Sequence, residues 1–209
     1  MWWKMDLMSK KQKIRIASSV AIILIVFGAY NIGTRINLNA AFEVGEVIDS
    51  LDGVAVYYNG GVNNVTERNV SDDGYNLGLK YQCVEFVKRY YFEHFNHRMP
   101  DTFGHAKDFF NKGIEHAGFS PKRGLYQYSN GQNELPKHGD LLVLKPTIFN
   151  RFGHVSIVSK VDTKAMTIEV VQQNPGPFGE SRESYMLSND QNKWRIKSDR
   201  VLGWLRKGK

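Results

Sequence analysis

The sequence predicts an α+β fold, in which helices pack on an antiparallel sheet, preceded by one apolar helix near the N-terminus. Three observations lead to this prediction. A charge-free apolar run follows a basic segment, helical periodicity dominates the middle of the chain, and β-branched or alternating runs dominate its last third. With 209 residues, 42% hydrophobic and 12% aromatic, the chain is long and apolar enough for one globular domain with appendages.

The first element is a basic segment followed by an apolar run. Residues 1–15 carry five basic side chains and one acidic side chain. The uncharged residues 16–34 span roughly 28 Å as a helix, which is about the hydrocarbon thickness of a bilayer. Because basic flanks stay in the cytoplasm, we expect a single-pass anchor in the cytoplasmic membrane with the rest of the chain on its outer side. A cleaved signal peptide and secretion are the alternative, although residues 39–41 make a poor cleavage site.

The remaining composition limits the partners. The whole chain has a net charge of +7, but residues 1–15 contribute +4 of it, so the basic excess gives little reason to expect nucleic acid. The single cysteine cannot form an internal disulfide or a multi-cysteine metal site, and the six histidines lack ligand spacing. We therefore expect a membrane contact through the N-terminal helix, and neither a metal nor another cofactor.

The elements after the anchor follow from local patterns. We expect residues 35–50 to form a linker and residues 51–209 to form the globular domain. Residues 59–78 are rich in Gly, Asn, Asp and Ser and predict a long loop. Apolar residues at three- and four-residue spacing predict helices over 82–95 and 101–116. Strands are expected at 44–48, 54–58, 141–144, 154–161, 167–173, 185–187 and 201–205.

Cys83 lies at the start of the first predicted helix of the domain. A helix N-terminus carries partial positive charge and unpaired N–H groups, which favour a thiolate and lower its pKa. The same groups can stabilise an oxyanion when the thiolate attacks an amide carbonyl. Cys83 is therefore the candidate nucleophile, with Tyr81 and Gln82 assigned to the adjoining oxyanion and substrate loop.

A cysteine nucleophile needs a base that later protonates the leaving amine, and histidine usually has this role. His94 lies eleven residues further along the same helix, roughly 16 Å by helical rise, and is too distant. His154 opens an apolar strand directly after Gly153, which places it on a rigid element with room for substrate to approach. We therefore expect His154 to be the base.

A third side chain should accept a hydrogen bond from the imidazole and fix its tautomer. On the strand expected near residues 167–174, Gln172 and Asn174 fall on the same face because side chains alternate. Asn174 precedes Pro175, which favours an extended backbone. Either amide oxygen fits this role, so both residues are candidate members of the site.

Three short motifs in this sequence resemble those of a known protein family. Tyr81–Phe86 (YQCVEF), Gly153–Val155 (GHV) and Gln172–Asn174 (QQN) are similar to the CHAP family of cysteine, histidine-dependent amidohydrolases and peptidases. Within it they resemble the amidase domain of glutathionylspermidine synthetase/amidase. The resemblance implies a papain-like fold, Cys83 as nucleophile, His154 as base, and the position of Gln172 as the group that orients the histidine. The family commonly has Glu at that position, so this chain lacks a negative charge beside the imidazole.

Together these features predict a thiol-dependent amide hydrolase in the cell envelope. The expected placement outside the membrane favours peptidoglycan peptides as substrate, whereas the resemblance favours a small glutathionylspermidine-like amide. A different class, an envelope binding protein with weak or no catalysis, is supported by the Gln172 departure.

Overall fold

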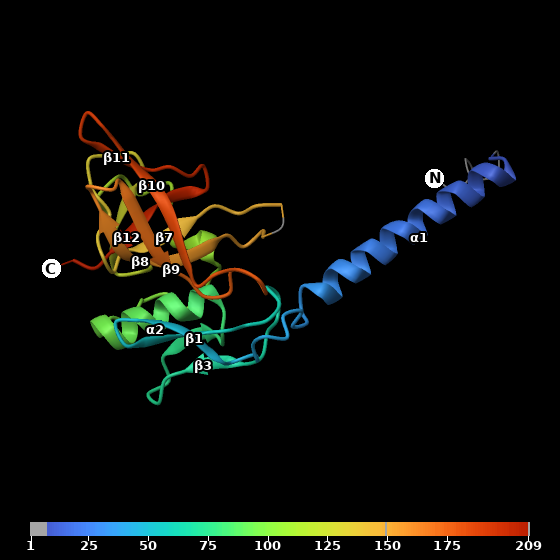
Figure 1. Ribbon diagram of the computed structural model, residues 1–209, viewed down its shortest axis with the longest axis horizontal. Coiled ribbons are helices and arrows are strands. Elements are labelled where there is room, and N and C mark those ends of the chain that lie inside the picture. Colours follow the sequence, from blue (N-terminus) through green and yellow to red (C-terminus); the bar gives the residue numbers. More distant parts are fainter. Residues whose placement is uncertain (1–7, 149, 209) are drawn as a thin grey trace.

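The computed structural model describes residues 8–148 and 150–208. It begins with helix α1 (Lys10–Gly33), which projects from the rest of the chain (Figure 1). The Ser9 and Gln12 side chains form a capping box at the N-terminus of this helix. Part of the predicted basic segment, residues 1–7, lies outside the described residues.

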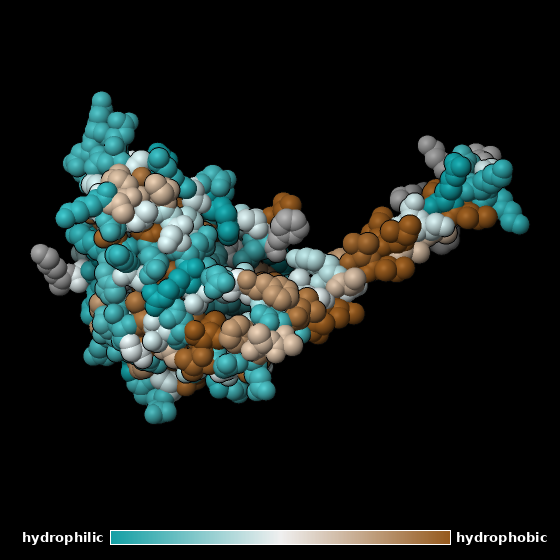
Figure 2. All heavy atoms as spheres, in the orientation of Figure 1, coloured by the Kyte–Doolittle hydropathy of each residue, from teal (hydrophilic) through white to brown (hydrophobic). Residues whose placement is uncertain are grey.

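Helix α1 has the length and composition of a membrane span. Among the described residues it is the one helix that meets this criterion, with a mean hydropathy of 2.0 and no residue buried against the domain. Hydrophobic side chains cover most of its length, whereas polar side chains cover much of the visible face of the domain (Figure 2). A signal sequence has the same properties, so α1 fits both expectations for the N-terminus.

One side of the domain holds two hairpins and the long helix α2 (Figure 1). Strands β1 and β2 pair antiparallel, as do β3 and β4. The predicted helix over 82–95 is confirmed, whereas the predicted loop over 59–78 contains β3 and the start of β4. The bounds are β1 Val47–Leu51, β2 Val54–Tyr57, β3 Arg68–Val70, β4 Asn76–Leu79 and α2 Cys83–Phe95.

The other side is an eight-stranded antiparallel sheet in the order β11-β10-β9-β8-β7-β12-β6-β5. The strands expected in the last third of the chain are present, which confirms the α+β class. Strands β5, β6 and β11 were not predicted. β5 is short, and β6 and β11 mix polar with apolar residues. The bounds are β5 Gly118–Ser120, β6 Leu125–Ser129, β7 Leu141–Leu144, β8 His154–Asp162, β9 Thr167–Val171, β10 Arg182–Asp190, β11 Lys193–Ile196 and β12 Val201–Arg206.

The predicted helix over 101–116 is wrong. Only a single 3-10 turn, Ala106–Phe109, forms there, and Phe110 is already extended. The Gln127 side chain binds the backbone of Asn111 at both its N–H (2.8 Å) and its carbonyl (2.9 Å). These tertiary hydrogen bonds replace those that a continuing helix would need. The apolar pattern was still informative, because Ala106 and Phe109 are buried in the core.

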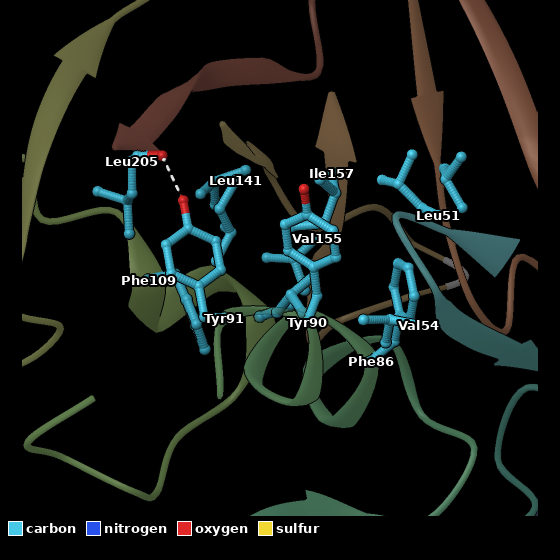
Figure 3. Packing of buried hydrophobic residues seen from close by; sticks show 14 of the residues in the cluster. Leu51, Val54, Phe86, Tyr90, Tyr91, Phe109, Leu141, Val155, Ile157 and Leu205 are labelled. Atoms are coloured by element: carbon cyan, nitrogen blue, oxygen red, sulfur yellow. Dashed lines mark hydrogen bonds between the residues drawn. The ribbon is translucent and has the colours of Figure 1, made fainter. Parts of the chain in front are cut away.

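The core joins α2 to the sheet (Figure 3). Phe86, Tyr90 and Tyr91 on α2 are fully buried and face the sheet residues Val155 and Leu205. The Tyr91 hydroxyl donates to the Leu205 carbonyl at 3.1 Å, so its polar end is satisfied. Each such side chain contributes on the order of 2 kcal/mol through burial. This packing fixes the N-terminal end of α2 beside the start of β8.

Candidate active site

Cys83 is the first residue of α2, as the sequence predicted. The preceding Tyr81 has a left-handed φ of 66°, and Gln82 returns to an extended conformation before the helix begins. The helix packs closely on β4 at Gly78, where a Cβ atom would lie 3.2 Å from Glu85 Cα. A larger residue at position 78 would push the first turn of α2, and Cys83 with it, away from β4.

The expected low pKa of Cys83 is wrong. Burial raises the pKa of the Cys83 thiol to about 11. The backbone N–H groups of Val155, Val84 and Cys83 itself lower the pKa, but their combined effect is smaller. The helix N-terminus therefore acts as predicted, while the loss of water around the sulfur dominates.

His154 opens β8 and is buried, with 7% of its surface exposed. The backbone N–H of its neighbour Val155 lowers the pKa of the Cys83 thiol, so the start of β8 lies near the start of α2. Gly153 has a different role from the one expected. A Cβ atom there would lie 2.8 Å from the Leu144 carbonyl oxygen and 3.1 Å from the Lys107 nitrogen, so protein backbone occupies the space assigned to substrate.

Gln172 accepts a hydrogen bond from His154, with 2.9 Å between Nε2 and Oε1. The Gln172 amide nitrogen donates to the Glu180 carbonyl at 3.1 Å and to Glu183 Oε2 at 3.3 Å. Because both acceptors lie on the nitrogen side, the amide oxygen must face the imidazole. His154 then carries its proton on Nε2, and Nδ1 is left as the basic nitrogen.

Burial lowers the pKa of His154 to about 4. The hydrogen bond to Gln172 favours the charged imidazolium and raises the pKa, whereas the positive charge of Arg200 lowers it. Burial thus disfavours a charge on either Cys83 or His154 alone. The two groups are uncharged at neutral pH unless a proton moves between them.

Asn174 lies elsewhere than predicted. Its φ of 58° is left-handed rather than extended, and β9 already ends at Val171. The Asn174 side chain donates to Gln82 Oε1 at 2.9 Å and to the Val62 carbonyl at 3.0 Å. Gln82 in turn donates to the Asn64 carbonyl at 2.7 Å. Asn174 therefore fixes the residue before Cys83, while Gln172 contacts the histidine.

Sequence reasoning missed the buried network beneath Cys83. The Gln173 amide donates to the Gln82 carbonyl at 3.1 Å and to Glu85 Oε2 at 2.8 Å. Glu85 is 1% exposed and forms an ion pair with Arg89 at 2.6 Å. The available signal was the alternation along the strand, which puts Gln173 opposite Gln172 and toward α2. This network holds the first turn of the helix.

The other polar candidates have different partners. His138 Nε2 lies 2.7 Å and His94 Nε2 3.8 Å from Asp52, in the turn between β1 and β2. Lys80, three residues before Cys83, forms an ion pair with Glu67 at 2.5 Å. Its charge is therefore compensated locally.

Comparisons with known proteins agree with the motifs. Residues 72–174 match the CHAP domain family, which confirms the resemblance of the motifs. Trypanothione synthetase from Crithidia fasciculata is 30% identical over 95 residues, which are 46% of this chain and 14% of that protein. The chain thus spans a small part of that relative. A solved structure described as "The crystal structure of Ly7917" has 22% identity and a TM-score of 0.26, covering 36% of this chain and 29% of the other.

Proposed function

We propose that this chain, whose residues 72–174 match a CHAP domain, is a cysteine amidohydrolase or peptidase. Cys83 is its nucleophile and His154 its base. The observation that supports this most is the orientation of His154. Gln172 Oε1 lies 2.9 Å from His154 Nε2, which leaves Nδ1 as the base, and the N–H of the next residue, Val155, lowers the pKa of the Cys83 thiol. Cys83 opens α2, His154 opens β8 and Gln172 directly follows β9, so three elements contribute to the proposed site.

The proposed reaction begins with an uncharged pair. As the Cys83 sulfur attacks the amide carbonyl carbon, its proton moves to His154 Nδ1, and charge develops on the carbonyl oxygen. Backbone N–H groups at the start of α2 stabilise that oxyanion. The C–N bond then breaks, and the imidazolium protonates the leaving amine. Water attacks the resulting thioester with His154 as base, releasing the acid and restoring the thiol.

Gln172 contributes through the tautomer. Its oxygen keeps the Nε2–H in place and accepts a stronger hydrogen bond when the imidazolium forms. A neutral amide supports this role because thiolate and imidazolium stabilise each other while the charges exist. The papain-like arrangement that the motifs imply is part of this proposal.

We propose α1 as an anchor that holds the domain on the outer side of the cytoplasmic membrane. This location favours peptidoglycan peptides as substrates. The similarity to trypanothione synthetase supports a second candidate, a small glutathionylspermidine-like amide.

Mass spectrometry tests the reaction and separates the substrates. The full chain in mild detergent is incubated with purified muropeptides or with glutathionylspermidine, beside its Cys83→Ala variant. New fragments that appear only with the unmodified chain support the mechanism and identify the substrate class. Equal fragments from both proteins would refute Cys83 as nucleophile.

A reporter fusion after Lys209 tests the location. A reporter that is active only outside the cytoplasm supports the anchor or a signal sequence, and the size of the product on a gel distinguishes the two. Activity confined to the cytoplasm would refute export.

A further inference from the structure

We propose that Glu183 is a positioning residue, whose carboxylate orients Gln172 and supplies the negative charge that Gln172 lacks. The inference rests on the proposed role of His154 as base. Gln172 Nε2 lies 3.3 Å from Glu183 Oε2, and Gln172 Oε1 lies 2.9 Å from His154 Nε2. One neutral amide thus connects a carboxylate to the imidazole.

Sheet pairing places Glu183 there. Strand β10 lies beside β9 with Glu183 opposite Val170, and Gln172 N–H donates to the Ser181 carbonyl at 2.8 Å beyond the last pair. Tyr185 lies on the same face as Glu183, two residues further along. The pKa of Tyr185 is raised by burial and by a hydrogen bond to the Glu183 carboxylate. Gln172 therefore binds this carboxylate, and Tyr185 lies beside it.

The charges around His154 explain what Glu183 adds. Cys83 approaches from α2 without a charge, and Arg200, between β11 and β12, disfavours the imidazolium. Gln172 from the end of β9 is neutral. The Glu183 carboxylate behind it polarises the amide, because an N–H that donates to an anion increases the negative charge on the amide oxygen. The acceptor facing His154 then resembles a carboxylate in part.

The test compares charge removal at two neighbouring carboxylates. Glu183→Gln removes the charge at the amide, while Glu180→Gln is the matched control, since the Glu180 contact to Gln172 is made by its backbone carbonyl. A double variant, Gln172→Glu with Glu183→Gln, moves the carboxylate next to the imidazole and leaves a carboxamide behind it. Each protein is the full chain in detergent, and the His154 signal is assigned from a His154→Gln spectrum.

Two readouts are measured. NMR titration of His154 in a Cys83→Ala background reports its pKa without requiring turnover, and kcat/KM is followed against pH. Glu183→Gln should lower the His154 pKa by about 0.5, equivalent to about threefold, and lower kcat/KM by about 3–10-fold. Glu180→Gln should change both by less than about twofold, and the double variant should restore or exceed the original pKa.

Equal effects of Glu183→Gln and Glu180→Gln on the His154 pKa would overturn the inference, as would a double variant that fails to recover it. If the pKa shifts as expected but every variant and the parent lack amidase activity, the positioning role stands and the proposed function fails. The two ideas are therefore refuted by different results.

Discussion

The buried histidine makes the stability of this protein depend on pH. His154 has a pKa of about 4 in the folded chain, against 6.5 for an unburied histidine. Between these values the unfolded chain binds a proton that the folded chain does not. The contribution of His154 to the free energy of unfolding is therefore complete above pH 6.5. It is lost progressively as the pH falls from 6.5 through 4. At about 1.4 kcal/mol for each pKa unit, the loss is about 3 kcal/mol.

Urea unfolding of the full chain in detergent, at pH values from 7.5 down to 4, measures this loss. His154→Gln keeps a polar side chain but removes the titration, so its free energy of unfolding should fall less over the same range. The difference between the two proteins isolates His154 from the other five histidines and from the carboxylates. Identical pH dependence would refute the reasoning, because it would mean that the folded chain protonates His154 as readily as the unfolded chain does.

Three further predictions concern the surroundings of the site. Because the Cys83 pKa is about 11, iodoacetamide labelling should keep rising with pH above 9; a plateau below pH 8, measured by intact mass, would contradict an uncharged resting pair. Gln173→Ala removes the donor to Glu85 Oε2 and one of the donors to the Gln82 carbonyl, so unfolding should become easier by about 2 kcal/mol; a change below about 0.5 kcal/mol in urea would contradict the network. Gly153→Ala places a Cβ atom 2.8 Å from the Leu144 oxygen at a φ of 76°, so it should cost about 1–3 kcal/mol and lower activity; unchanged melting and turnover would show that the backbone there yields freely.

Short-range patterns decide the structure around the two proposed catalytic residues. Helical spacing located the start of α2 and therefore Cys83, and strand alternation located His154 at the start of β8. The same reasoning failed over 101–116, because Gln127 from another strand binds the backbone that would have continued the helix. It also failed at Asn174, where contacts to Gln82 and Val62 accompany a left-handed backbone.

The amino-acid order alone was enough to predict the α+β class, the apolar N-terminal helix, and the residue types of the proposed Cys–His–amide site. These follow from periodicity and from chemistry that adjacent residues carry with them. Three features depend on packing: burial outweighs the helix terminus at Cys83, Gln172 rather than Asn174 contacts His154, and Glu183 lies behind that amide. Desolvation and hydrogen-bond partners depend on which strands and helices pack together, and this packing brings together residues that are far apart in the chain.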